Sequence, residues 1–334
     1  MKTMIEIFDD HSGKTTLKWS SYIKLYEKLF SPFKDKNVNI LEIGVQNGGS
    51  IEIWSKYFKN FANIVGCDSD PKCVELEFAN QNIHIINGDA CSENIQEKII
   101  RLCERYDIII DDGSHISHQI IDSFIRYFDA LDNGGIYIVE DLHCSYWKEY
   151  NGGLYYPKSA MSFFKRLADV INFEHIGTEK TRQDLLLGFN THSGEHIKEE
   201  TLSMISSVSF HNSVCVITKG EPKLNTLGKL MICGTTSSIC NNHTNFDSKS
   251  FPPSQESNFW STLKTSPDEE WETLEEQNLL NEKKISELTN FIDEQNNKIQ
   301  SLEYSLDAVV DSISWKITKP IREMLYLYRR KNLK

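Results

Sequence analysis

Apolar and polar residues alternate along the first half of the chain in a pattern that predicts parallel β-strands separated by helices. Short, almost continuously apolar runs bounded by turn residues predict strands at Val38–Gly44, Ile64–Asp68, Ile83–Asn87, Tyr106–Asp112 and Ile136–Glu140. Helical spacing of apolar residues predicts helices at Ser20–Phe30, Ser50–Phe58, Cys73–Asn80, Asn94–Arg105 and Ser117–Leu131. This alternation, with strands apolar on both faces, indicates an α/β fold built on a buried parallel sheet.

The stretch after the fifth strand carries a weaker pattern. Met204–Phe210 and Val214–Thr218 are predicted to form an antiparallel hairpin that closes the sheet, with Asn212 in its turn. Together these elements predict a Rossmann-like sheet of seven strands in a domain that spans residues 1–233.

Beyond residue 233 the composition changes. Residues 234–266 are rich in Ser, Thr and Asn and contain Pro252-Pro253, which predicts a polar linker. Ser266, Pro267 and Glu269 then supply a capping box with proline at the first helical position. A long helix is therefore expected to begin there.

That helix carries the heptad pattern of a coiled coil over residues 267–313. Steps of three and four residues separate a mainly apolar seam: Ile285, Leu288, Ile292, Gln295, Ile299, Leu302, Leu306, Val309 and Ile313. Asn278 and Asn281 continue the seam upstream, where polar residues weaken the pairing but can fix its register. The pattern favours self-association, and the alternative is one amphipathic helix that folds back on the first domain.

The last residues, 314–334, form a basic segment in which positive and apolar side chains are mixed. Glu323 is its one acidic residue among seven basic ones: Lys316, Lys319, Arg322, Arg329, Arg330, Lys331 and Lys334. Such a segment fits either a helix on an anionic membrane surface or a solvated basic tail.

Composition and net charge argue against some classes of protein, among them membrane-spanning and nucleic-acid-binding proteins. The 334 residues contain no apolar run near the roughly 20 residues that span a bilayer, and no leader pattern begins the chain, so a soluble or peripheral cytoplasmic protein is expected. The net charge of −12 argues against nucleic acid as a partner, because phosphate binding depends on clustered Lys and Arg. The 8 cysteines show no C-x-x-C spacing, so we expect buried, reduced thiols.

A turn with glycines follows the first predicted strand and marks a candidate cofactor site. It contains Glu42, Gly44 and Gly48, and the glycines let backbone N–H groups approach a ligand closely. Gln46 stands where a dinucleotide-binding turn needs its second glycine, which disfavours a pyrophosphate. The wider turn suits S-adenosylmethionine, which has no phosphate.

Acidic residues follow the next two strands. Asp68 ends the second strand, where a carboxylate can accept hydrogen bonds from both ribose hydroxyls, and Asp89 follows the third, within reach of an adenine amino group. We predict that both bind the cofactor. The alternative is that these residues only form turns and cap helices.

Acidic pairs also end the fourth and fifth strands. Asp111-Asp112 ends the fourth and Glu140-Asp141 ends the fifth, so a parallel sheet brings both pairs to the edge that holds the cofactor turn. Carboxylates so close together raise one another's pKa or share a cation, and Mg²⁺ is the usual partner of such oxygen ligands. We predict that Asp112, Glu140 and Asp141 bind the metal; the alternative is that some of them only cap helices or hold loops.

His115 is the predicted general base. It lies three residues after Asp112, close enough to reach a hydroxyl at the metal, and an imidazole titrates near neutral pH. The hydroxyl oxygen would then attack the methyl carbon of the sulfonium in line. His118 is a rival base, although a histidine at the start of a helix more often packs or caps.

Four sequence runs also occur together in a known enzyme family: LEIGVQNGGS at Leu41–Ser50, VGCDSDP at Val65–Pro71, DDGSHISH at Asp111–His118 and GGIYIVEDLHCSYW at Gly134–Trp147. They resemble metal-dependent sugar O-methyltransferases of the mycinamicin type and related proteins of bacterial polysaccharide clusters. The resemblance covers residues 19–234. It implies a class I methyltransferase fold, S-adenosylmethionine, Mg²⁺, a sugar hydroxyl as acceptor, Asp112, Glu140 and Asp141 as metal ligands and His115 as base.

A second, shorter resemblance concerns the ending SWKITKPIR at Ser314–Arg322, which is similar to tails that follow coiled coils in surface-polysaccharide glycosyltransferases and their partners. The leading hypothesis is therefore a methyltransferase of a surface polysaccharide or its precursor, with the coiled coil joining a second copy or a glycosyltransferase at the inner face of the membrane. One alternative is a methyltransferase of a natural-product glycoside or another small hydroxylated molecule. A non-catalytic scaffold is a further alternative.

Overall fold

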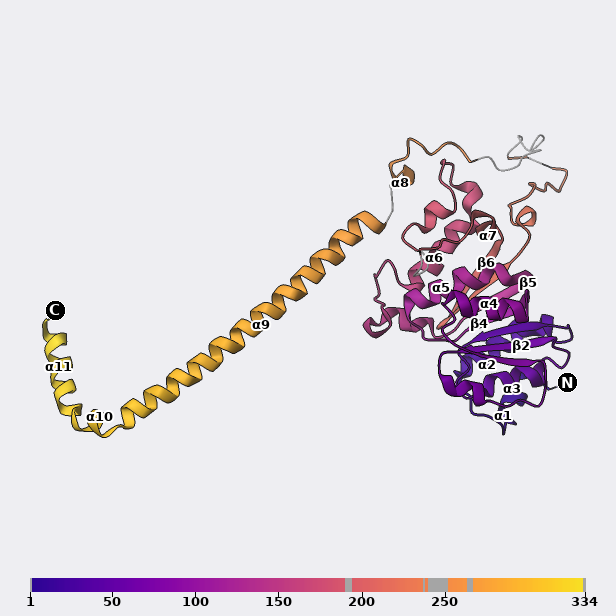
Figure 1. The fold of residues 1–334 in the computed structure, drawn as a ribbon. Coiled ribbons are helices and arrows are strands. Elements are labelled where there is room, and N and C mark those ends of the chain that lie inside the picture. The colour runs from indigo at the N-terminus through magenta and orange to yellow at the C-terminus, as the bar shows by residue number, and fades with distance from the viewer. Residues whose placement is uncertain (1, 190–193, 237, 240–251, 263–266, 333–334) are drawn as a thin grey trace. The chain divides into compact units, whose positions relative to one another are not determined.

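The computed structural model describes residues 2–189, 194–236, 238–239, 252–262 and 267–332. Its chain divides into two compact units, Met1–Pro267 and Asp268–Lys334 (Figure 1). The predicted linker lies partly outside the described residues.

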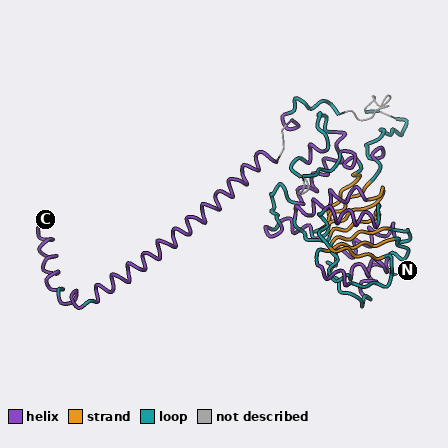
Figure 2. The backbone as a smooth tube through the Cα atoms, in the orientation of Figure 1, coloured by secondary structure: helices purple, strands orange, loops and turns teal. Residues whose placement is uncertain are grey.

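A seven-stranded sheet forms the centre of the first unit, as the orange strands in Figure 2 show. Its order is β3-β2-β1-β4-β5-β7-β6. The first five strands are parallel, and β7 runs antiparallel between β5 and β6. The strands are β1 (Asn39–Ile43), β2 (Asn63–Asp68), β3 (Ile83–Asn87), β4 (Tyr106–Asp111), β5 (Leu131–Val139), β6 (Ile205–His211) and β7 (Val214–Lys219). The predicted fold class, with its closing hairpin, is confirmed.

Helices cover both faces of this sheet because neighbouring residues of each strand point to opposite sides. Ile40 belongs to the core cluster of α1, α2 and α3, whereas Leu41 belongs to the cluster of α4, α5, α6 and α7. The helices are α1 (Met4–Asp9), α2 (Ser20–Phe30), α3 (Gly49–Tyr57), α4 (Glu93–Leu102), α5 (Ser117–Tyr127), α6 (Ala160–Ile171) and α7 (Glu199–Ser203). The parallel strands therefore lie between two helical layers, as their continuous apolar character predicted.

Two predicted helices differ from the structure. The helix predicted at Cys73–Asn80 is wrong: this stretch holds only a 3-10 helix, Pro71–Glu75, and then continues as extended chain. Leu76 and Phe78, two residues apart, both pack against the α2–α3 core, which an extended segment allows and a helix does not. The other helix, predicted to run to Leu131, ends at Tyr127 because β5 already begins at Leu131.

Three helices make up the second unit after the short α8 (Phe259–Thr262) of the first: α9 (Pro267–Asp311), α10 (Ile313–Ile317) and α11 (Lys319–Asn332). Ser312 separates the first two, since its Oγ accepts a hydrogen bond from the backbone N–H of Trp315 at 3.2 Å and caps a new helix. The continuous helix thus ends before Ile313, the last predicted seam position. Among the described helices, none is long and apolar enough to span a bilayer.

Candidate active site

The carboxyl ends of β1 and β4 lie side by side at the centre of the sheet, where the chain order changes direction. In open α/β sheets, ligands bind at this point. Gly44 directly follows β1 with φ of +92°, and a Cβ atom there would lie 2.0 Å from the backbone oxygen of Asp112. A glycine is therefore required for the turn after β1 to pack against the loop after β4.

The loops at this edge hold non-glycine residues in the left-handed backbone conformation. Gln46 follows β1 with φ of +50°, His115 follows β4 with +59°, and Asp141 follows β5 with +49°. Each such conformation costs about 1–3 kcal/mol and persists only where the surrounding structure enforces it, most often at functional sites. Their position at one edge supports a functional site there.

Asp112, His115 and Asp141 come together at this edge. Nε2 of His115 lies 4.0 Å from Oδ1 of Asp112 and 3.7 Å from Oδ2 of Asp141, and ligand atoms of all three lie within 4.8 Å of one another. Ligands about 2.1 Å from one octahedral Mg²⁺ lie between about 3 and about 4.2 Å apart. The two distances from His115 fall in that range, and the three side chains, each 21–24% exposed, form a candidate site for one accessible cation.

Glu140, the third predicted metal ligand, lies outside that group. Its buried carboxylate accepts hydrogen bonds from Nζ of Lys18, at 2.7 Å, and from the hydroxyl of Tyr26. Nζ of Lys18 also lies 2.6 Å from Oδ2 of Asp112. Burial alone would lower the pKa of Lys18, but Glu140 and Asp112 raise it above its usual value, so the lysine stays charged. The carboxyl ends of β1, β4 and β5, called the acidic edge below, thus already contain one cation, the ammonium of Lys18.

Two aromatic side chains at the start of α2 orient Asp141. Nε1 of Trp19 and the hydroxyl of Tyr22 donate to Oδ1 of Asp141, at 3.0 and 2.7 Å. This leaves Oδ2 as the oxygen nearer His115. The sequence patterns assigned no role to Trp19 and Tyr22, nor to Lys18 and Tyr26. The four-residue spacing of the two tyrosines, which puts both hydroxyls on one face of the predicted helix, was the available signal.

Glu42 lies fully buried at the end of β1. Its Oε2 accepts a hydrogen bond from Oγ of Ser50 at 2.9 Å, whereas its Oε1 has no hydrogen-bond partner among the described residues. Burial raises the pKa of Glu42 to about 7, although nearby Lys18 lowers it. A buried oxygen without a partner fits a site that a ligand donor completes.

Gly48 and Asp68 shape the predicted cofactor turn. Gly48 precedes α3 in the left-handed conformation, with φ of +80°. Oδ2 of Asp68 accepts hydrogen bonds from the backbone N–H groups of Val45 and Gln46, both at 2.8 Å, so it holds the turn after β1. Its Oδ1 accepts a hydrogen bond from the backbone N–H of Asp70 at 2.9 Å. Burial alone would raise the pKa of Asp68, but the hydrogen bonds from Asp70, Gln46 and Val45 lower it, and the carboxylate is charged.

Asp89 is exposed after β3, next to the end of β2 in the sheet order. Its Oδ1 accepts a hydrogen bond from the backbone N–H of Cys91 at 2.9 Å, a turn-forming contact. The structure therefore gives Asp89 a local turn contact and leaves its other oxygen at an exposed edge.

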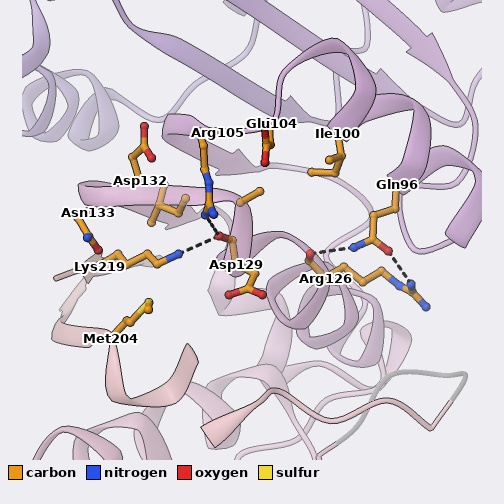
Figure 3. Close-up of a pocket in the computed structure, with 12 residues that line it drawn as sticks. Gln96, Ile100, Glu104, Arg105, Arg126, Asp129, Asp132, Asn133, Met204 and Lys219 are labelled. Carbon is orange, nitrogen blue, oxygen red and sulfur yellow. Dashed lines mark hydrogen bonds between the residues drawn. The ribbon is translucent and has the colours of Figure 1, made fainter. Parts of the chain in front are cut away.

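A pocket of about 570 Å³ opens at the opposite edge of the sheet, where β4 and β5 begin (Figure 3). There, Nη1 of Arg105 and Nζ of Lys219 donate to the backbone oxygen of Asp129, at 2.6 and 2.8 Å. This carbonyl lies in the 3-10 turn that ends α5, where cations stabilise the negative end of a helix. The pocket is thus separate from the acidic edge. Arg105 and Lys219 are explained by their hydrogen bonds to the turn that ends α5.

The chain is similar in sequence to proteins named as sugar O-methyltransferases. The chain is 34% identical over 162 residues to the 8-demethyl-8-alpha-L-rhamnosyl tetracenomycin-C 2'-O-methyltransferase of Streptomyces olivaceus, which is 46% of this chain and 42% of the relative. It is 30% identical over 168 residues to the mycinamicin VI 2''-O-methyltransferase of Micromonospora griseorubida, 47% of this chain and 41% of the relative. The chain thus spans less than half the length of these curated relatives. No family model matches it.

A solved structure shares the arrangement of the first unit. The MycE methyltransferase of the mycinamycin pathway, in complex with Mg and SAH, superposes with a TM-score of 0.54 and 23% identity over 66% of this chain and 55% of that one. With the observed sheet order, this likeness shows that the chain has the Rossmann-like fold of the class I S-adenosylmethionine-dependent methyltransferases.

Proposed function

We propose that this protein is a Mg²⁺-dependent O-methyltransferase that moves a methyl group from S-adenosylmethionine to a sugar hydroxyl. The convergence of Asp112, His115 and Asp141 beside the turn after β1 is the observation that carries the proposal. The sugar O-methyltransferase names of the similar proteins support it.

The predicted cofactor residues have distinct roles in this proposal. Gly44 and Gly48 keep the turn after β1 open to the cofactor, and Asp68 holds that turn in place with Oδ2. Its Oδ1, which already accepts one backbone hydrogen bond, has a second lone pair for the cofactor. Glu42 offers its unpaired Oε1 to an ammonium or hydroxyl donor. Asp89 offers an oxygen to the adenine amino group from the exposed edge after β3.

When bound, the metal polarises the acceptor hydroxyl and S-adenosylmethionine supplies an electrophilic methyl group. Asp112 and Asp141 are the proposed ligands that hold the metal, and Trp19 and Tyr22 fix the orientation of Asp141. His115 accepts the hydroxyl proton at Nε2, which faces both carboxylates. His115 has a left-handed backbone, and its Nε2 lies within 4.0 Å of an oxygen of each carboxylate.

Glu140 remains a predicted metal ligand. Lys18 and Tyr26 both donate to its Oε1, so Oε2 is the oxygen that Glu140 would offer to a metal. Glu140 also acts through Lys18, which donates to Oδ2 of Asp112 as well.

For the acceptor we propose a sugar of a surface polysaccharide or its precursor, with α9 assembling the enzyme and the basic tail lying near the inner face of the membrane. The heptad pattern and the basic segment support this substrate class, because a small glycoside does not require either. The alternative is a natural-product glycoside, which the names of the relatives favour.

A methyl-transfer assay with labelled S-adenosylmethionine tests the activity. Nucleotide sugars, polysaccharide fractions and macrolide glycosides are offered as acceptors, each with Mg²⁺ and with chelator. We expect transfer to a sugar acceptor that chelator abolishes and added Mg²⁺ restores. Full activity in chelator would overturn the metal assignment. Transfer to macrolide glycosides alone would select the alternative.

The role of the second unit is tested in cells that make the polysaccharide. A chain truncated after Gly234 is compared with the full chain at equal abundance. We expect reduced methylation of the surface glycan by the truncated chain and equal activity on a soluble acceptor in vitro. Unchanged glycan methylation would remove the proposed assembly role.

A further inference from the structure

The seam of α9 consists of large apolar side chains that remain exposed. Ile285, Leu288, Ile299, Leu302 and Leu306 are each more than half exposed. The 45 residues of α9 extend over about 67 Å at 1.5 Å per residue. An exposed apolar seam of this length indicates a partner that covers it.

The residue types along the seam indicate how many helices pair. With Ile285 at heptad position a, the a positions hold Ile285, Ile292, Ile299 and Leu306, and the d positions hold Leu288, Gln295, Leu302 and Val309. β-Branched residues at a combined with leucine at d favour a two-stranded parallel coiled coil.

The flanking charges indicate which way the helices run. Over residues 282–303, the charged e positions are acidic, Glu282 and Glu303, and the charged g positions are basic, Lys284 and Lys298, on opposite sides of the seam. Upstream, Glu275 at e and Glu270 at g are both acidic. In a parallel pair, g of one helix faces e of the next heptad of its partner, so Lys298 faces Glu303. In an antiparallel pair, g faces g and e faces e, which brings like charges together.

We infer that α9 pairs with α9 of a second copy of this chain as a parallel, in-register, two-stranded coiled coil. Within residues 282–303 the charges favour a second copy as the occupant, because Lys298 of one copy faces Glu303 of the other. Asn278 and Gln295, polar positions within the seam, then meet their own counterparts and fix the register. Parallel pairing brings both basic tails to one end of the coiled coil. The inference does not depend on the proposed enzymatic activity.

Single-cysteine variants of the full chain test the orientation. Gln295→Cys and Leu302→Cys, both at d, are oxidised mildly, and the cross-linked peptides are identified by mass spectrometry so that native cysteines do not confuse the result. We expect each variant to cross-link to its own counterpart at least about ten-fold more than the outward-facing control Asn297→Cys at f. An antiparallel pair can bring only one of the two d positions opposite itself, so cross-linking at one position alone would overturn the inference.

Sedimentation equilibrium at micromolar concentration tests the number of strands. We expect twice the chain mass, and a monomeric or trimeric mass would overturn the inference. Glu303→Lys is expected to weaken the dimer several-fold, the control Glu294→Lys at c to leave it unchanged, and the double change Lys298→Glu with Glu303→Lys to restore it. An unchanged dimer in Glu303→Lys would contradict the proposed charge pairing.

Discussion

The acidic edge of the sheet and the seam of α9 differ in whether their side chains find partners within the same chain. At the edge, side chains from distant segments satisfy one another: Lys18 is 122 residues from Glu140, and Tyr22 is 119 from Asp141. Along α9, apolar side chains of the described residues stay exposed. Contacts within one chain therefore explain the edge, whereas we infer that a second chain covers the apolar seam.

The largest expected difference between the two regions is in the unfolding free energy lost when a large apolar side chain is truncated to alanine. Phe124 is fully buried, with its ring centroid 4.8–5.5 Å from those of Phe128, Tyr137, Phe163 and Phe164. Phe124→Ala is expected to cost the first unit about 3–5 kcal/mol of unfolding free energy. Leu302→Ala is expected to change it by less than about 0.5 kcal/mol. Urea unfolding followed by fluorescence measures both, and equal losses would break the distinction between the two regions.

A smaller but more local effect is expected at the turn after β1. Gly44→Ala places a Cβ 2.0 Å from the backbone oxygen of Asp112 and is expected to cost about 3 kcal/mol and abolish cofactor binding. The matched control is Gly134→Ala, which has a similar φ of +84° but nothing within 4 Å, and is expected to cost about 1 kcal/mol. Chemical denaturation and calorimetric titration with the cofactor measure the two effects. Similar losses in both variants would mean that the contact with Asp112 is unimportant.

Loss of the proposed base should affect turnover alone. His115→Ala is expected to lower turnover by about 10²-fold, because a positioned base contributes that much, and to leave cofactor affinity intact. His118→Ala serves as the control, since His118 is exposed and contacts Asn151 rather than the acidic group. If His118→Ala were the slower enzyme, the assignment of the base would move to His118.

A further prediction concerns the pH dependence of stability. Burial raises the pKa of Glu42 from 4.5 to about 7, so the folded state binds this proton more tightly than the unfolded state. Its stabilising contribution is full below about pH 4.5 and is lost as pH rises towards 7, at most about 3 kcal/mol. Glu42→Gln keeps an acceptor for Ser50 and should flatten the stability curve in this window. Parallel curves for the two proteins would show that Glu42 does not titrate there.

Much of the site follows from one property of the sequence. Asp68, Asp112 and Asp141 each lie at the carboxyl end of a strand, and parallel strands put such ends on one edge whatever the details of packing. Local patterns could therefore predict which of these residues meet. Glu42 is also placed by its strand, but its burial could not be read from the pattern.

Contacts that depend on distant packing could not be predicted. Lys18 lies in a segment without regular structure, and nothing in its neighbours indicates that it reaches Asp112 and Glu140. The stretch after Pro71 has helical spacing, yet tertiary packing of Phe78 keeps it extended. Both outcomes are decided by residues far away in the sequence.

The ion pairs of Lys18 affect how the acidic edge of the sheet can fold without a bound metal. Neighbouring carboxylates repel one another, and a newly made chain with this many at one edge would resist closing it. In the folded chain, the ammonium of Lys18 balances part of that charge. The fold therefore carries its own counter-charge at this edge and is not expected to need a divalent ion to close it.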